Sequence, residues 1–209
     1  MIITDIVETN IGSAKKKTAY KVYIDYDYAF LLYKQDIKAY QIEIGSEINS
    51  ELYDKIIEET VYRRAKQKSL AILKHMDRTE RELYKKLKDA YYTDIITSRT
   101  IEYLKGYNYI DDRRYASNYI RIKKNTMSKL SIKTKLIQKG INKEILEKII
   151  AIEYDVDDYN TDPEILAINK AIHKKHYDIK DLSWDEKQKL IASLYRKGFD
   201  LDKINSCLK

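Results

Sequence analysis

A six-residue motif recurs three times along the chain. LIQKGI at 136–141 matches LYRKGF at 194–199, and LKDAYY at 87–92 occupies the equivalent place one unit earlier. Self-similarity of this kind is typical of repeat proteins, in which one unit buries too little apolar surface alone and stacked neighbours form a continuous core. The sequence therefore predicts three tandem repeats that stack into a curved solenoid with an extended concave face.

Each repeat is expected to contain three helices, because apolar residues recur at helical spacing between start and stop signals. The repeats should cover about 61–110, 111–160 and 161–209. The expected helices are 61–76, 79–89 and 94–105 in the first repeat, 112–126, 131–139 and 142–152 in the second, and 162–176, 184–197 and 201–208 in the third. Residues 50–209 are thus predicted to be mainly α.

Start and stop signals support these helices. Thr79 and Ser183 are each followed three residues later by a glutamate, which is the pattern of a capping box. Asp162 precedes the only proline of the chain, a residue that is well tolerated in the first turn of a helix. Three glycines, Gly106, Gly140 and Gly198, fall where helices should stop and are expected in the left-handed conformation.

Residues 1–49 follow a different pattern and should form a small β-rich segment. Apolar residues at 20, 22 and 24 alternate with polar neighbours, and Tyr28 to Tyr33 is a second β-prone run. The residues between these runs, 25–27, predict a β-hairpin. Ile2 to Val7 and Tyr40 to Ile44 are expected to add short strands before Gly45 and Ser46 mark the exit.

The stretch GYNYIDDRRYASNYI at 106–120 raises the question of catalytic or metal chemistry, because two aspartates adjoin two arginines. A carboxylate at the start of a helix accepts free backbone N–H groups and interacts favourably with the helix dipole. We therefore interpret Asp112 as the cap of the next helix, with Asp111 as the alternative, and disfavour acid–base or metal chemistry.

The sequence contains only weak signals for other metal-binding or phosphate-binding sites. His173 and His176 stand three residues apart on an expected helix, but no third ligand is evident. DVDDYNTD at 155–162 resembles a calcium loop, yet Asn160 replaces the required glycine and Leu166 the bidentate glutamate. No glycine-rich phosphate loop is present. We expect a protein that is not an enzyme and that needs no cofactor or metal.

The cysteine content and the apolar runs of the sequence indicate the cellular compartment of the protein. The single cysteine, Cys207, cannot form an internal disulfide, and the first residues lack the features of a signal peptide. No apolar run approaches the length of a membrane-spanning helix. A cytoplasmic protein with no membrane partner is expected, and a monomer.

Charge is concentrated in one part of the chain. The formal net charge is +7, and the ten charged residues from Arg113 to Lys143 are all Lys or Arg. Such a segment presents a positive field whatever its fold, which predicts a polyanionic partner. In the third repeat, neighbouring acids should dilute the field of lysines such as Lys174. The candidate contacts for such a partner are Arg113, Arg114, Arg121, Lys123, Lys124, Lys129, Lys133, Lys135 and Lys139.

Several of these stretches resemble the RecX family of bacterial recombinase regulators in order and spacing. They are RTERELYKKL at 78–87, IEYLKGYNYIDDRRYASNYI at 101–120 and LIQKGI at 136–141. YKVYIDYDYAFLLY at 20–33 is similar to the N-terminal extension of longer members. The first repeat departs from the family pattern because Ala90 and Tyr91 replace Lys-Gly, which puts the sharpness of that helix end in doubt.

The resemblance implies a non-enzymatic modulator, mainly an inhibitor, of the RecA recombinase. Such a protein would dock in the groove of the RecA filament on single-stranded DNA and regulate recombination, DNA repair and the SOS response. The alternative is a protein that binds nucleic acid directly and non-specifically through the basic middle repeat. Direct contact with DNA should then be weak and salt-sensitive. A third reading is a structural scaffold for an acidic protein.

Overall fold

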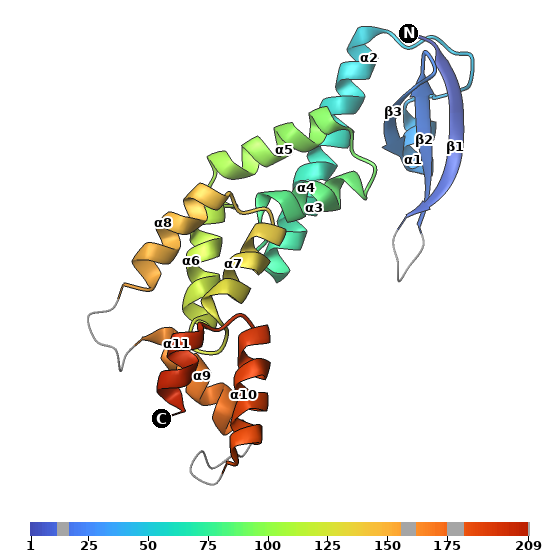
Figure 1. The fold of residues 1–209 in the computed structure, drawn as a ribbon. Coiled ribbons are helices and arrows are strands. Elements are labelled where there is room, and N and C mark those ends of the chain that lie inside the picture. The colour runs from blue at the N-terminus through green and yellow to red at the C-terminus, as the bar shows by residue number, and fades with distance from the viewer. Residues whose placement is uncertain (12–16, 156–161, 175–181, 209) are drawn as a thin grey trace. The chain divides into compact units, whose positions relative to one another are not determined.

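The computed structural model of the protein describes residues 1–11, 17–155, 162–174 and 182–208 (Figure 1). These residues are mainly helical and begin with a small β-sheet, as the sequence predicts, and the sheet has three strands. They form two structural units, Met1–Ile110 and Asp111–Lys209. Every helix in the described ranges is too short or too polar to span a lipid bilayer.

The first unit opens with an antiparallel sheet in the order β1-β2-β3, formed by Ile3–Ile11, Lys17–Ile24 and Asp27–Leu32. The turn between β2 and β3 has positive φ angles at Asp25 (48°) and Tyr26 (72°). Two successive left-handed residues match the twist of the flanking strands, so this turn closes a tight hairpin. The predicted hairpin is therefore confirmed.

The predicted strand at Tyr40 to Ile44 is wrong. The chain forms helix α1 (Lys34–Ala39), which ends at Tyr40, and the left-handed φ of Gln41 (53°) then reverses the chain direction. The Asp36 carboxylate fixes the start of α1 by accepting the N–H of Tyr33 at 2.8 Å. Of the alternating apolar residues at 40, 42 and 44, only Ile42 is buried, at 4% exposure, and Ile44 is 62% exposed, so the alternation does not mark one buried face of a strand.

One long helical stretch leads out of the sheet. It consists of α2 (Ser50–Lys55), the π-helical segment η1 (Ile56–Tyr62) and α3 (Arg63–His75), and the Asn49 side chain caps it by accepting the N–H of Leu52 at 2.8 Å. A π-helical turn changes which residues share a face. Here Thr60, Val61 and Tyr62 are all buried, and Val61 and Tyr62 belong to a core shared with the sheet residues Val22 and Phe30.

The remaining repeat helices all occur near their predicted places. The first unit ends with α4 (Glu80–Lys88) and α5 (Asp94–Gly106). The second unit contains two three-helix groups, α6 (Asp112–Lys123), α7 (Lys129–Gln138) and α8 (Lys143–Glu153), then α9 (Pro163–His173), α10 (Trp184–Arg196) and α11 (Leu201–Cys207). The last part of the helix predicted at 162–176 lies outside the described residues.

Each three-helix group of the second unit has its own core. Ile120, Leu136 and Leu146 are fully buried in the first group. Ile168, Leu194 and Ile204 are fully buried in the second group. The apolar positions that predicted the helices from their spacing are therefore the residues that hold each group together.

The predicted helix starts are confirmed. Thr79 and Glu82 form the reciprocal hydrogen bonds of a capping box, and Ser183 does the same with Glu186. Asp162 accepts the N–H of Glu164 at 2.8 Å, directly before Pro163 in the first turn. Each cap satisfies backbone donors that have no partner within the helix.

The three copies of the repeat motif end their helices in the same way. In each copy the sixth residue donates its N–H to the carbonyl of the first, and the fifth residue is left-handed, which is a Schellman motif. The three hydrogen bonds are Tyr92 to Leu87 at 3.2 Å, Ile141 to Leu136 at 3.0 Å and Phe199 to Leu194 at 3.4 Å. The left-handed residues are Tyr91 (φ 64°), Gly140 (97°) and Gly198 (83°).

Two details differ from the expected pattern. The helix in the first repeat ends sharply although Tyr91 replaces glycine, a conformation that costs a non-glycine residue about 1–2 kcal/mol. Gly106 is not left-handed, contrary to prediction, because it is still the last residue of α5. Asn108 (φ 56°) takes the left-handed position instead, and Tyr109 donates its N–H to Leu104 at 2.9 Å.

Candidate functional site

The aspartate pair at the start of α6 has a structural role. Asp111 Oδ1 accepts the N–H groups of Arg113 at 2.8 Å and Arg114 at 3.1 Å, and its backbone is extended, so Asp111 is the N-cap. The choice of Asp112 as the cap is therefore wrong, and the alternative is right. Asp112 is the first residue of the helix, where its charge still favours the positive end of the dipole.

The described residues contain no group of three or more His, Cys, Asp or Glu side chains arranged to hold a metal ion. His173 is exposed at the end of α9. Its predicted companion His176 lies outside the described residues, as does the 156–161 portion of the acidic stretch. The weak metal signals of the sequence thus receive no support from the described ranges.

The basic segment occupies α6, α7 and their connection, and it has an acidic neighbour at the end of α8. Glu153 is only 8% exposed, and Nε of Arg121 donates to its Oε1 at 2.8 Å and to its Oε2 at 3.0 Å. Nζ of Lys124 donates to the backbone carbonyl of Glu153 at 2.8 Å, and the Ser117 hydroxyl also donates to its carboxylate. Arg121 and Lys124 therefore help to hold α6 against α8.

This cluster controls the ionisation of Glu153. Burial opposes the charged form, but hydrogen bonds from Arg121 and Ser117, together with the charges of Arg121 and Lys124, outweigh it and leave the pKa of Glu153 below its ordinary value. The carboxylate is thus ionised at neutral pH. Its negative charge offsets part of the positive field of the segment.

Two further predicted cations on α7 lie beside residues of other helices. Lys133 forms an ion pair with Glu147 of α8. The backbone N–H of Lys129 donates to Glu164 of α9 at 3.3 Å, and its ammonium lies 5.2 Å from the centre of the Tyr154 ring. The basic segment contains no Asp or Glu of its own, but the fold places Glu147 and Glu164 beside two of its lysines.

The predicted cations therefore do not form one uniform group. Lys139 lies 5.5 Å from the centre of the Tyr115 ring, and the exposed Arg114 also has an interaction partner. Arg113, Lys123 and Lys135 make no ion pair with any residue of the described ranges. We call these three the unpaired cations. They are the members of the predicted set whose charge is most available to a partner.

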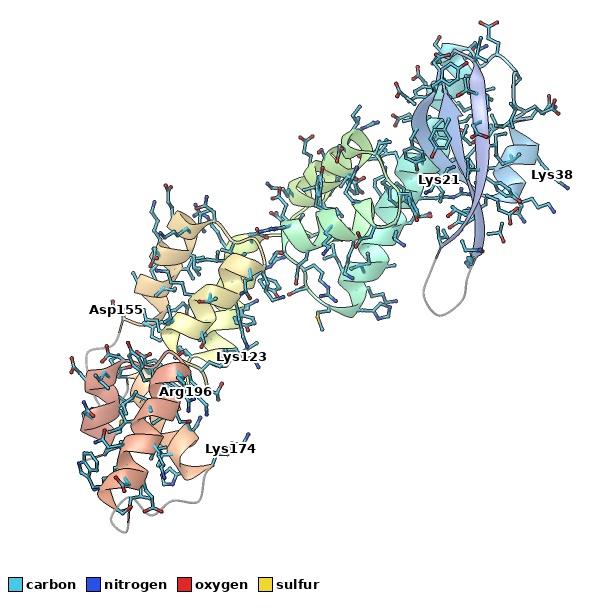
Figure 2. The ribbon with its side chains drawn as sticks, turned by 45° about the vertical axis from the view of Figure 1, so that its right-hand side comes forward. Lys21, Lys38, Lys123, Asp155, Lys174 and Arg196 are labelled. Carbon is cyan, nitrogen blue, oxygen red and sulfur yellow. The ribbon has the colours of Figure 1, made fainter. Side chains whose placement is uncertain are left out.

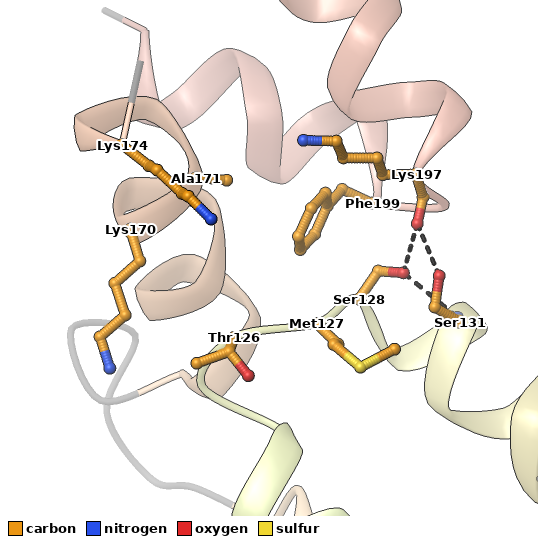
Figure 3. Close-up of a pocket in the computed structure, with 9 residues that line it drawn as sticks. All are labelled: Thr126, Met127, Ser128, Ser131, Lys170, Ala171, Lys174, Lys197 and Phe199. Carbon is orange, nitrogen blue, oxygen red and sulfur yellow. Dashed lines mark hydrogen bonds between the residues drawn. The ribbon is translucent and has the colours of Figure 1, made fainter. Parts of the chain in front are cut away.

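A hollow in the second unit, which we call the lysine pocket, was not predicted. Its volume is about 680 Å³. Figure 3 shows its lining residues, which come from the α6–α7 connection, the start of α7, the end of α9 and the turn after α10: Thr126, Met127, Ser128, Ser131, Lys170, Ala171, Lys174, Lys197 and Phe199. The available sequence signal is the i,i+4 pair Lys170 and Lys174 on one helix face.

Two serine hydroxyls join the groups of the second unit beside this pocket. Ser128 Oγ donates to the carbonyl oxygen of Lys197 at 2.7 Å, and Ser131 Oγ donates to the same oxygen at 2.8 Å (Figure 3). Ser128 also caps α7 by accepting the N–H of Ser131 at 3.1 Å. One main-chain oxygen thus fixes the position of the motif turn after α10 against the start of α7.

The family models that match the chain are those of the RecX second three-helix domain, over residues 111–149, and third three-helix domain, over residues 164–208. A curated relative, the regulatory protein RecX of Clostridium acetobutylicum, is 32% identical over 198 residues, which are 93% of this chain and 91% of the relative. The chain belongs to the RecX family.

A second curated relative supports the same assignment, and two solved structures share the fold. The regulatory protein RecX of Clostridium perfringens strain 13 is 33% identical over 90% of this chain and 87% of its own. Among solved structures, a crystal structure of regulatory protein RecX has a TM-score of 0.60 at 23% identity and covers 98% of both chains. RecX from Lactobacillus salivarius has a TM-score of 0.56 at 24% identity, over 70% of this chain and 94% of its own. Both structures share the fold.

Proposed function

We propose that this RecX-family protein is a non-enzymatic modulator, mainly an inhibitor, of the RecA recombinase. It binds in the groove of the RecA filament on single-stranded DNA and thereby regulates recombination, DNA repair and the SOS response in the cytoplasm. The observation that carries the proposal is the match to relatives named regulatory protein RecX over more than nine-tenths of the chain.

The repeats provide a physical basis for this role. In the proposal they form a curved solenoid that follows the helical groove, and one monomer contacts several recombinase protomers. Binding at linked sites raises the overall affinity through effective concentration, so a filament is preferred over free recombinase. The exposed basic residues of the middle repeat support attraction to the anionic filament.

The unpaired cations Arg113, Lys123 and Lys135 are the proposed contact residues within the basic segment. Arg121 is a poor choice for mutation, because a glutamate in its place would lie beside the buried carboxylate of Glu153 and weaken the fold. A stability loss of that kind would imitate a loss of binding. The unpaired cations avoid this confusion since no ion pair of the described residues depends on them.

The test is a triple variant, Arg113→Glu, Lys123→Glu and Lys135→Glu, compared with the wild type in inhibition of RecA ATP hydrolysis and in co-sedimentation with RecA filaments. We expect weaker binding by at least about tenfold and a flatter dependence of affinity on salt, because fewer counterions are released. The matched control is Lys34→Glu, Lys148→Glu and Lys189→Glu, three exposed lysines outside the stretch from Arg113 to Lys143 with the same total charge change.

The control separates local contact from net charge. Equal loss of inhibition in both variants would show that total charge, and not the unpaired cations, carries the interaction. No association of the wild-type protein with RecA filaments would refute the proposed function itself.

The second candidate function is direct, non-specific binding of nucleic acid, which the same unpaired cations favour. Affinity for naked single-stranded DNA at physiological salt distinguishes the two. If naked DNA binds as tightly as the RecA filament, the second function is favoured, because phosphate contacts alone then account for the affinity.

A further inference from the structure

The lysine pocket has walls that are held in place without a ligand. Its floor lies where the α6–α7 connection meets the turn after α10, and the hydrogen bonds from Ser128 and Ser131 to the Lys197 carbonyl fix that meeting point. Gly198 lies against Leu130 on the same seam, since a Cβ added to Gly198 would be 3.3 Å from the leucine side chain. The pocket is therefore preformed, which lowers the entropic cost of binding.

The charges around the pocket have one sign. Lys170, Lys174 and Lys197 line it, and none of its lining residues is acidic. In Figure 3, Lys174 and Lys197 approach from opposite sides, with their ammonium groups directed toward the space between them. None of the three lysines forms an ion pair within the described ranges. Asp178 and Asp181, the acids expected to dilute the field of Lys174, lie outside the described residues, and the lining of the pocket is positive, which favours an anionic occupant.

The positive field continues toward the basic segment. Nζ of Lys135 lies 4.0 Å from Sδ of Met127, which lines the pocket. Figure 2 shows that Lys123 and Lys174 project from the same side of the second unit. A ligand that enters the pocket would therefore meet further cations at its edge.

The interior of the pocket is apolar. Met127, Ala171 and Phe199 contribute to its lining, and about 680 Å³ is far more space than a single phosphate or carboxylate fills. The Phe199 ring is only 4% exposed, so it does not present an open face on which a nucleobase could stack. These features favour an apolar side chain over a base as the group that enters.

The spacing of two lysines suggests the form of the ligand. Lys170 and Lys174 are one helical turn apart, which places their Cβ atoms about 5–6 Å from each other. Alternate residues of an extended chain are separated by about 6–7 Å and point to the same side. Carboxylates at alternate positions of an extended segment match this spacing; in Figure 3 Lys174 points toward the pocket and Lys170 away from it, so Lys170 would turn toward the segment on binding.

We propose that the lysine pocket binds an extended acidic segment of a partner protein, with a bulky apolar side chain in the pocket and carboxylates on Lys170, Lys174 and Lys197. This inference goes beyond the proposed function because it assigns a peptide-binding site to the junction of two repeats. It does not require that the segment belong to the recombinase. The test therefore uses an isolated peptide and no filament.

The probe is a fluorescein-labelled decapeptide of alternating Asp and Glu with Phe-Leu at its centre, and binding to the full-length protein is followed by fluorescence anisotropy. We expect saturable binding that weakens with added salt. A matching peptide with Ser-Ser at its centre should bind several-fold less tightly, because it lacks the group that fills the apolar interior.

The protein variant is Lys170→Ala, Lys174→Ala and Lys197→Ala, and the control is Lys143→Ala, Lys148→Ala and Lys189→Ala, which removes three exposed charges elsewhere in the second unit. An exposed ion pair contributes about two- to threefold in affinity, so the pocket variant should bind the peptide about tenfold less tightly. The control should change affinity by less than about twofold. Circular dichroism checks that both variants are folded.

Three results would overturn the inference. They are no saturable binding of the peptide, equal loss in the pocket variant and the control, and tighter binding of a ten-nucleotide single-stranded DNA that displaces the peptide. The last result would make the pocket a nucleic-acid site. The proposed function stands or falls separately, because it is tested by inhibition of RecA with the unpaired cations exchanged.

Discussion

Substitution of Gly198 by alanine tests how the second and third repeats are joined. Gly198 has a φ of 83°, in the left-handed region, and a Cβ there would lie 3.1 Å from Ser128 Oγ and 3.3 Å from two carbons of Leu130. The backbone strain costs about 1–2 kcal/mol. The close contacts add about 1 kcal/mol or more, since Ser128 is held by Lys197 and cannot move away freely. We expect a total loss of about 2–3 kcal/mol.

Two other glycines separate the contributions. Gly45 has the same φ of 83° but open space around its Cβ position, so Gly45→Ala should cost only the backbone strain of about 1–2 kcal/mol. Gly106 is helical and also open, so Gly106→Ala should stabilise the protein by about 0.5–1 kcal/mol. Each variant adds one methyl group, and the three positions differ in backbone conformation and in the space around that group.

The measurement is urea denaturation followed by circular dichroism, with hydrogen exchange at buried amides to assign the loss to a unit. For Gly198→Ala, the amides of Leu194 and Ile204 should exchange faster than in the wild type, because both residues belong to the core of the third repeat. If Gly198→Ala costs no more than Gly45→Ala, the contact with the second repeat does not limit this position. A Gly45→Ala variant as stable as the wild type would refute the backbone argument.

Two further predictions concern the start of α6 and its contact with Glu153 of α8. Asp111→Ala should destabilise the second unit by about 0.5–2 kcal/mol, and Asp112→Ala by clearly less, because only Asp111 caps the helix; equal losses in urea denaturation would contradict this assignment. The folded-state pKa of Glu153 is lowered, so its contribution to stability is complete above the unfolded pKa of about 4.3 and is lost as the pH falls through the folded value. Glu153→Gln should therefore reduce the acid-induced loss of unfolding free energy between about pH 5 and 3, and an unchanged pH dependence would show that this carboxylate is not responsible.

Local patterns in the sequence were enough to predict the repeat helices. Their capping residues and their motif turns act within about six residues, so the free energy that selects each helix end is encoded nearby. Tyr91 shows the limit of this reasoning, because the hydrogen bond from Tyr92 to Leu87 preserves the turn without glycine. At 40–44 the alternating pattern was misleading, since Ile42 is buried in a turn after α1 whereas Ile44 is exposed.

The candidate site was predicted less completely. The absence of acids between Arg113 and Lys143 predicted a basic region, but the sequence did not show that Arg121 pairs with Glu153, because these residues are 32 positions apart. The lysine pocket was missed for the same reason, because its lining residues are far apart in the sequence. Ser128, for example, donates to the carbonyl oxygen of Lys197, 69 positions away. Only the packing of helices brings these groups together, and no local period of the sequence records that packing.

The carbonyl oxygen that joins the two repeats belongs to Lys197, yet the lysine side chain takes no part in those two hydrogen bonds. Every amino acid carries the same oxygen, so exchange of this residue leaves the joint intact while altering the charge at the pocket. Ser128 and Gly198 have no such freedom, because one acts through its hydroxyl and the other through the lack of a side chain. Substitution at position 197 can therefore change the binding chemistry of this junction without disturbing its assembly, whereas substitution of Ser128 or Gly198 would disturb the assembly itself.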